Sequence, residues 1–174
     1  SLQKAMRGLE IGSSGFESPE IAKNIKAIKP RLITPTPERL WFIGEAFRKG
    51  MDVSDIQSFT GIDLWFLKEV QEIINYEKII KSKKFLTSKN LFLEAKKIGF
   101  SDKRIADLTN KSEKDIRFKR RRLNIKPVFK RVDTCAAEFE TSTAYMYSTY
   151  QDECESNPTK KKKIMVLGGG PNRI

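Results

Sequence analysis

Residues 46–67, AFRKGMDVSDIQSFTGIDLWFL, decide the fold, because their pattern returns 49 residues later in residues 95–116, AKKIGFSDKRIADLTNKSEKDI. Both stretches place a glycine four residues after an alanine, then a short apolar segment, then a polar residue suited to capping a helix. The two correspond without a gap, and such a fixed period is typical of a duplicated unit. Each copy predicts a helix that ends at the glycine, a short second helix, and a capped third helix.

The matched positions carry the features that a pair of similar helical subdomains needs. Apolar, glycine and threonine positions match as Ala46/Ala95, Gly50/Gly99, Ile56/Ile105, Phe59/Leu108, Thr60/Thr109 and Leu67/Ile116, and Asp63 matches Ser112 as a cap. We therefore predict an internal duplication, with repeats near 37–81 and 88–124, in which 46–67 and 95–116 have the same arrangement of helices.

Capping signals place the remaining helices. Residues 18–20, Ser-Pro-Glu, put proline at a first helical position and predict a helix to about Ile28. Residues 36–38, Thr-Pro-Glu, repeat the device for a helix that ends at Gly50, and a short helix is expected over 53–60. Further helix starts are predicted at the capping residues Asp63, Ser88, Ser101 and Ser112.

The sequence changes character after Leu123. Pro127 begins an extended stretch, and residues 141–150 are rich in Thr and Tyr, which favours strand or extended chain. Residues 155–163 are lysine-rich and predict an exposed linker. Residues 164–174, IMVLGGGPNRI, predict a buried strand that enters a glycine turn, where backbone N–H groups can approach an anion. The expected fold is all-α, with two similar small helical subdomains, an extended C-terminal connection and one terminal strand.

The composition excludes several kinds of active site. The 174 residues contain no histidine, which removes Ser-His-Asp and Cys-His catalysis and His-ligated zinc. Two cysteines are too few for a Cys-only zinc site, and we expect free thiols. No apolar run approaches the roughly 20 residues that a membrane span needs. We therefore predict no catalytic residue, no metal site, no membrane partner and a cytoplasmic location.

The net charge of +12 admits two interpretations, a nucleic-acid footprint or a solvated lysine-rich surface. In the second copy the last helix resembles the basic recognition helix of a helix-turn-helix module, with Lys114, Arg117, Lys119, Arg120, Arg121 and Arg122. In the first copy the same helix carries Leu64-Trp65-Phe66-Leu67, which is unsuited to reading DNA. A helix-turn-helix nucleic-acid-binding module is thus the alternative. Ion-paired or solvent-facing Arg117, Arg120 and Arg121 would favour a scaffold instead.

Two adjacent aromatic pairs, Trp41-Phe42 and Trp65-Phe66, are the candidate contact residues. Neighbouring side chains leave a helix in different directions, so one member of each pair can fill the core while the other is exposed. Exposed aromatic side chains are frequent anchors of protein interfaces. Burial of both pairs between the two repeats is the equally open alternative.

Three stretches near the C-terminus carry a family resemblance: residues 130–139, KRVDTCAAEF, residues 143–150, TAYMYSTY, and residues 164–174. Together they resemble the large subunit of carbamoyl-phosphate synthetase. Residues 3–10, QKAMRGLE, are similar to the end of that subunit's first synthetase half, and residues 39–43 and 63–67 are similar to its central helical segment.

The resemblance implies a division of the chain into four parts. Residues 1–17 would be the end of the first synthetase half and a linker, and 18–126 the helical oligomerisation domain. Residues 127–163 would be an extended connection and linker, and 164–174 the first strand and glycine turn of the second half. Because both ends look cut, we expect an excised piece of a larger protein.

The resemblance also implies a parent enzyme, an ATP-dependent ligase. Its two ATP-grasp halves would use ATP with Mg or Mn to make carbamoyl phosphate for arginine and pyrimidine biosynthesis, from bicarbonate and from ammonia released by a glutaminase small subunit. Gly168, Gly169, Gly170 and Arg173 would bind the cofactor only in that full-length parent. For the piece alone we expect no cofactor and no activity. Its expected role is architectural, with self-association, the two synthetase halves and the small subunit as partners and no specific nucleic acid.

Overall fold

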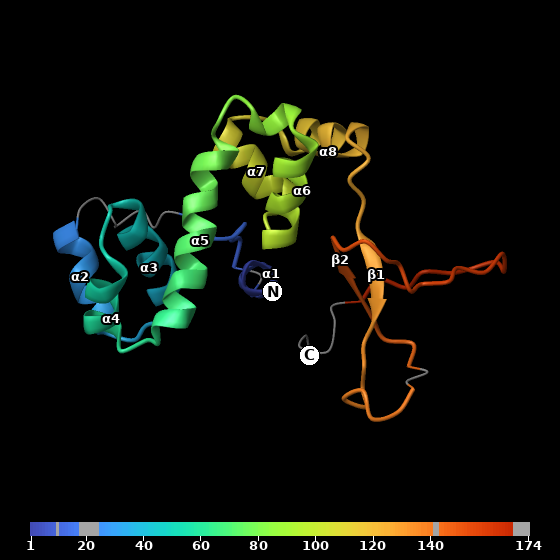
Figure 1. The fold of residues 1–174 in the computed structure, drawn as a ribbon, viewed down its shortest axis with the longest axis horizontal. Coiled ribbons are helices and arrows are strands. Elements are labelled where there is room, and N and C mark those ends of the chain that lie inside the picture. The colour runs from blue at the N-terminus through green and yellow to red at the C-terminus, as the bar shows by residue number, and fades with distance from the viewer. Residues whose placement is uncertain (10, 18–24, 141–142, 169–174) are drawn as a thin grey trace. The chain divides into compact units, whose positions relative to one another are not determined.

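The computed structural model describes the chain apart from residues 10, 18–24, 141–142 and 169–174. Its internal contacts separate two units, Ser1–Lys126 and Pro127–Ile174. The first is helical and the second holds a small two-stranded sheet (Figure 1). The predicted mostly helical class with an extended C-terminal connection is confirmed. The helices are α1 (Leu2–Gly8), α2 (Ile25–Ile33), α3 (Arg39–Arg48), α4 (Val53–Thr60), α5 (Leu64–Ile80), the 3-10 helix η1 (Phe85–Thr87), α6 (Lys89–Ile98), α7 (Asp102–Thr109) and α8 (Glu113–Arg122).

The duplication is visible in the order of helices and in their ends. The series α3, α4, α5 is repeated by α6, α7, α8, and α7 begins and ends 49 residues after α4. Gly50 and Gly99 both have positive φ, 80° and 107°, after the first helix of each series. The middle helices end at Gly61 and Asn110, both left-handed. Equivalent residues therefore reverse the chain at equivalent points, which supports the predicted repeat.

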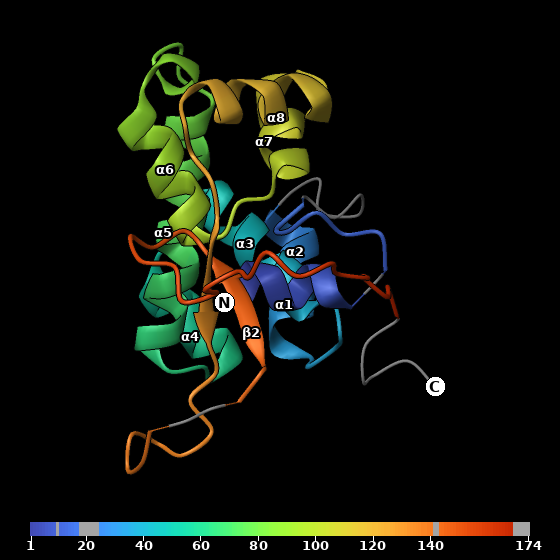
Figure 2. The same cartoon turned by 90° about the vertical axis from the view of Figure 1, so that its right-hand side faces the viewer.

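Helix α5 belongs to both copies. It packs against α3 and α4 in the first series and against α6 and α7 in the second, whereas α2 packs against α3 and α4 (Figures 1 and 2). In the first copy α2 precedes α3 and α4 and packs against both. In the second copy α5 has the same role, because it precedes α6 and α7 and packs against both. Helix α5 is the last helix of the first copy and the opening helix of the second, so one rigid helix joins the two.

The matched apolar positions form the core of the helical unit. Ala46 and Ala95, Ile56 and Ile105, and Leu67 and Ile116 are all buried, each with at most 1% exposed area. The predicted inward face of α5 is confirmed, because Leu67, Val70 and Ile74 are buried. The side chains of Asp63, Ser88, Ser101 and Ser112 each accept a backbone N–H bond at the start of their helices, as the capping pattern predicts.

Two helix boundaries differ from the sequence prediction. Helix α2 continues to Ile33 instead of ending near Ile28, because Ile28 and Leu32 lie one turn apart and are both fully buried. Their burial keeps Pro30 inside the helix despite its missing N–H. The predicted start at 18–20 lies outside the described residues. Helix α3 begins at Arg39, after residue 38 rather than at 36, and its N-cap makes no side-chain bond.

The second unit is a short antiparallel ladder. Strand β1 (Val128–Arg131) pairs with β2 (Met146–Thr149), Val128 opposite Thr149. The Nζ of Lys130 donates to Glu155 at 2.8 Å, which ties the chain after β2 back to β1. The strand expected from residue 164 is not seen over 164–168, which have no regular secondary structure and whose apolar side chains are 83–87% exposed. A strand needs a paired neighbour, and none lies beside these residues in the described part of the chain.

Candidate functional site

The two aromatic pairs have opposite environments. Trp41 and Phe42 are buried in the helical unit, and the indole N–H of Trp41 donates to the carbonyl of Gly15 at 2.9 Å. Trp65 and Phe66 are 61% and 60% exposed. One pair is therefore buried and the other exposed, whereas one of the two interpretations of the sequence placed a buried and an exposed member in each pair. Only Trp65 and Phe66 remain available as contact anchors.

The exposed pair stands on the first turn of α5. Asp63 caps this turn by accepting the N–H of Trp65 at 2.8 Å, which fixes the helix start. The Trp65 and Phe66 rings meet edge to face, with centroids 4.9 Å apart and planes at 86°. This geometry is favourable for aromatic pairs and holds both rings in one orientation on the surface. The pair is consequently an ordered apolar projection.

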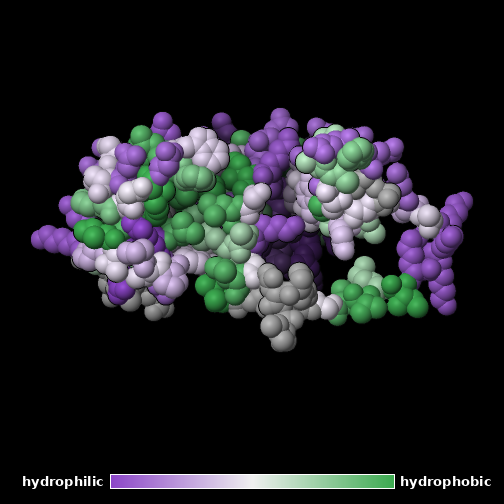
Figure 3. All heavy atoms as spheres, turned by 90° about the horizontal axis from the view of Figure 1, so that it is seen from below, coloured by the Kyte–Doolittle hydropathy of each residue, from purple (hydrophilic) through white to green (hydrophobic). Residues whose placement is uncertain are grey.

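An apolar hollow of about 660 Å³ adjoins this pair. Apolar residues from α1, α3, α5 and α6 and from the turn before α5 line it, among them Leu2, Leu40, Ile43, Ile62, Val70, Ile73 and Ile98. Glu69, Glu72 and Lys97 add charges of both signs to its lining. Hydrophobic residues gather in a patch on this unit in the space-filling view (Figure 3). An apolar centre with charged residues beside it is the composition of a protein–protein contact surface.

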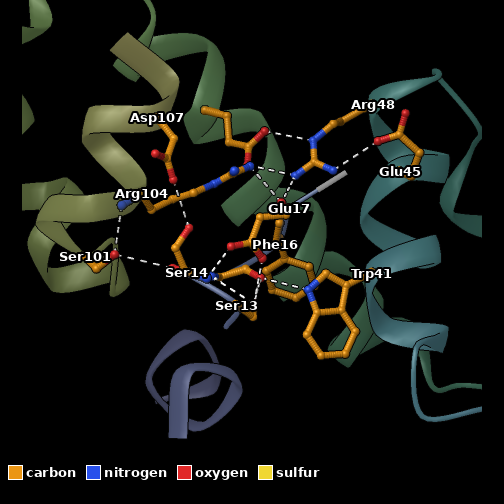
Figure 4. A network of polar contacts seen from close by, with 12 residues as sticks. Ser13, Ser14, Phe16, Glu17, Trp41, Glu45, Arg48, Ser101, Arg104 and Asp107 are labelled. Atoms are coloured by element: carbon orange, nitrogen blue, oxygen red, sulfur yellow. Dashed lines mark hydrogen bonds and ion pairs between the residues drawn. The ribbon is translucent and has the colours of Figure 1, made fainter. Parts of the chain in front are cut away.

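A second feature lies inside the unit. Residues 13–17, Ser-Ser-Gly-Phe-Glu, form a segment that we call the strap, which runs between the first and second copies (Figure 4). On the side of the first copy, α3 meets it through the Trp41 bond to Gly15. On the side of the second copy, Ser14 Oγ lies 3.1 Å from an Asp107 carboxylate oxygen, and Ser101 Oγ lies 3.4 Å from the Ser14 carbonyl. The side chain of Phe16 is 1% exposed.

A buried ion cluster joins the strap to three helices. Arg48 of α3 donates to both carboxylate oxygens of Glu77 at 2.8 and 2.9 Å, and Arg104 of α7 donates to Glu77 at 2.6 Å. Both arginines also donate to the carbonyl of Phe16. Burial alone would raise the pKa of Glu77, but hydrogen bonds and charge from Arg48 and Arg104 outweigh it and hold the pKa below its ordinary value. Glu77 is therefore ionised, and one carboxylate from α5 holds the two copies together.

The strap is also held by its own carboxylate. Glu17 accepts from the Ser13 hydroxyl at 2.6 Å and from the Ser14 backbone N–H. Partial burial opposes ionisation, but the bonds from Ser13 and Ser14 prevail and lower the pKa of Glu17 to about 2. The charged form therefore closes the strap into a tight turn at neutral pH.

The basic helix α8 does not present all of its cations freely. Arg117 pairs with Glu113 at 2.6 Å, and Arg120 pairs with Asp102 at 3.0 Å and donates to the Ile125 carbonyl. Arg121 is exposed. These are the arrangements expected of a scaffold rather than of a DNA-reading face.

The other predicted features lie in the second unit. Gly168 is exposed, with open space where a Cβ would stand, while Gly169, Gly170 and Arg173 lie outside the described residues. Cys135 and Cys154 are free thiols, as predicted. Within the part of the chain that the structure describes, no group of acidic, Cys or His side chains could hold a metal ion, and no helix is long and apolar enough to cross a membrane.

Sequence reasoning missed the strap and the ion cluster. It treated residues 1–17 as the end of one unit and a linker. The available signal was Phe16, a large apolar residue within a glycine–serine stretch, next to Gly15. The cluster had no local signal, because Arg48, Glu77 and Arg104 are separated by 27 to 29 residues and become neighbours only through the packing of α3, α5 and α7.

Comparison with known proteins identifies the unit that these features build. Residues 1–124 match the family described as carbamoyl-phosphate synthetase large chain, oligomerisation domain. The carbamoyl phosphate synthase large chain of Buchnera aphidicola is 53% identical to the whole chain, which spans 17% of that relative. The corresponding large chains of Pseudomonas aeruginosa and Vibrio cholerae are 46% and 48% identical over the whole chain, which covers 17% and 16% of them. The chain thus spans about a sixth of the length of these relatives.

Proposed function

Since this chain belongs to the family of the carbamoyl-phosphate synthetase large chain, at its oligomerisation domain, we propose that it joins large chains through the exposed Trp65–Phe66 face. The observation that carries the proposal is the ordered projection of these two rings beside an apolar hollow. The occupant of that face is the same face of a second copy of the chain.

Association of two such faces would be driven by the burial of apolar area that is now exposed to water. Two aromatic rings that are about 60% exposed leave a large apolar area in water, and burial recovers roughly 25 cal/mol for each Å². The lining contains both Glu69 and Glu72 and the cation Lys97. A two-fold contact brings a patch against itself, so a patch with both signs can pair its own charges across the axis. The interface should bury on the order of 1,000 Å² or more.

The parent enzyme follows from the relatives as part of the same proposal. It is a cytoplasmic, glutamine-dependent carbamoyl-phosphate synthetase that serves arginine and pyrimidine biosynthesis. It consumes bicarbonate, ATP with Mg or Mn, and ammonia from a glutaminase small subunit. In it this chain spaces the two synthetase halves, with 1–17 following the first half, 18–126 as the oligomerisation domain, 127–163 as the connection, and 164–174 opening the second half. Gly168, Gly169, Gly170 and Arg173 face ATP only there, and this chain alone is inactive.

Nucleic-acid binding by a helix-turn-helix module is the weaker candidate. Arg117 pairs with Glu113 and Arg120 with Asp102, so these two arginines of α8 already have partners within the chain. No observation in the described structure favours reading of a DNA groove over a solvated basic helix.

The mass of the chain in solution tests self-association. We expect a dimer or larger assembly by light scattering at tens of micromolar, and a folded monomer after Trp65→Glu or Phe66→Glu. Phe118→Glu is the matched control, because Phe118 is 63% exposed but lies on α8, away from the hollow. Circular dichroism establishes that the variants are folded. A wild-type chain that is monomeric at high concentration, or a control that dissociates as fully as the variants, would reject the Trp65–Phe66 face as the contact.

A further inference from the structure

Residues 13–17 are separated by long stretches of sequence from what they touch. The strap contacts α3, 26 residues later through Trp41, and α7, almost 90 residues later through Arg104. Helix α1 before it also reaches the second copy. Gln3 donates to the Ile98 carbonyl at 3.2 Å and Arg7 to the Gly99 carbonyl at 2.8 Å. Both bonds satisfy carbonyls at the C-terminal end of α6, which is a favourable place for a cation.

We infer that the strap sets the mutual angle of the two copies, and that α1 carries the position of the preceding chain into that angle. This inference rests on the proposed architectural function and assigns its control to residues 1–17. When the strap is docked, both copies donate hydrogen bonds to it. When it leaves, the copies keep α5 as their shared helix and lose the buried carbonyl that Arg48 and Arg104 share.

The geometry of the strap shows that its fit is demanding on both sides. Gly15 has φ +149°, and a Cβ there would lie 3.1 Å from the Gln3 side-chain oxygen. A Cβ on Gly44 of α3 would lie 3.0 Å from the Phe16 ring. Gly99 is just as close to α1, with 3.3 Å between a Cβ and that of Gln3. The absent side chain of Gly44 makes room for the strap, and those of Gly15 and Gly99 make room for Gln3 of α1.

The shared carbonyl explains how the strap can couple the copies. Arg48 and Arg104 come from different copies, and both donate to the carbonyl of Phe16 and to Glu77. Removing the carbonyl takes a shared hydrogen-bond acceptor from both guanidinium groups, although Arg48 keeps Glu45 and Glu77 and Arg104 keeps Glu77. The strap therefore adds a link between α3 and α7 to the one that Glu77 makes, and its loss weakens their connection. In the inference, docking of this shared acceptor is the step by which the strap biases the angle between the copies.

Trp41 makes the docked strap directly observable. The chain has two tryptophans, so Trp65→Phe leaves Trp41 as the sole tryptophan, which can be excited selectively at wavelengths that tyrosine does not absorb, with its indole bonded to the strap at Gly15. In that background Gly15→Ala should shift Trp41 emission to longer wavelength while helical circular dichroism is retained. Gly12→Ala is the matched control, because Gly12 also has positive φ, +85°, but open space around its Cβ position. It should leave the emission unchanged.

Distances between the copies complete the test. Cys135 and Cys154 are first replaced by serine, and exposed Ser54 of α4 and Lys103 of α7 are replaced by cysteine. A spin label is then attached to each of the two new thiols. The distance distribution should broaden or shift in Gly15→Ala and match the parent in Gly12→Ala. If Gly15→Ala does not fold, Ser14→Ala, which removes the bond to Asp107, is used in the same comparison. An unchanged distribution with shifted Trp41 emission, or emission that changes only on global unfolding, would overturn the inference. The mass of the samples that keep Trp65 separately decides self-association.

Discussion

Gly44→Ala should separate strap packing from helix propensity, because the two effects have opposite signs. Alanine in a helix interior is favoured over glycine by about 0.5–1 kcal/mol. In α3, however, the new methyl would stand 3.0 Å from the Phe16 ring and 3.2 Å from Ile74 Cδ1. Overpacking of this kind costs roughly 1–3 kcal/mol. We therefore expect a net destabilisation of about 1 kcal/mol, measured by urea unfolding followed with circular dichroism.

The sign should reverse when the ring is removed. In a Phe16→Val background the smaller side chain frees space into which Ile74 Cδ1, the other atom close to the new methyl, can move, so Gly44→Ala should stabilise by about 0.5–1 kcal/mol through propensity alone. The double-mutant cycle then reports a coupling of about 1.5–2 kcal/mol between positions 16 and 44. Gly8→Ala is the control, because Gly8 is helical and has nothing within 4 Å of its Cβ position. Equal effects of Gly44→Ala in both backgrounds would refute the claim that Phe16 of the strap occupies the space beside Gly44.

Three further predictions concern pH, ATP and nucleic acid. The folded pKa of Glu17 is lowered from 4.5 to about 2, so the ionised side chain stabilises the fold fully above pH 4.5 and loses this effect as the pH falls toward 2. The difference in unfolding free energy between the chain and Glu17→Gln should therefore shrink over that window and stay constant from about pH 5 to 7. The chain should not bind ATP measurably by calorimetry, because residues 164–168 have no paired strand to position a phosphate-binding turn; micromolar affinity would contradict this. The charge of +12 should give weak DNA association without sequence preference, and tight binding to one sequence that survives ~0.2 M salt would restore the helix-turn-helix alternative.

The parts of the fold that could be predicted are those whose causes are local. Helix α4 begins and ends where the pattern places it, and Gly61 in the left-handed conformation ends it. The C-terminal extent of α2 could not be predicted, because Leu32 is buried by other helices rather than by its neighbours in sequence. The exposure of Trp65 rather than Trp41 is also a tertiary fact. Both residues lie on helices of similar pattern, and the contact of Trp41 with Gly15 of the strap joins residues 26 apart in the sequence.

The two copies have similar buried residues but different exposed residues. The exposed differences indicate where each copy has its own role. Leu67 and Ile116 occupy matched positions on α5 and α8 and are both 1% exposed, so the core of the duplicated unit is the same. On the exposed turn just before them, Trp65 and Phe66 in the first copy correspond to Lys114 and Asp115 in the second. Charged side chains keep that turn of α8 in water, whereas aromatic rings on α5 favour contact with another surface. In the proposed assembly the first copy thus offers the contact face, while the second receives α1 through the Ile98 and Gly99 carbonyls at the end of α6. A duplicated helical unit can in this way attach to its own chain with one copy and to a second chain with the other.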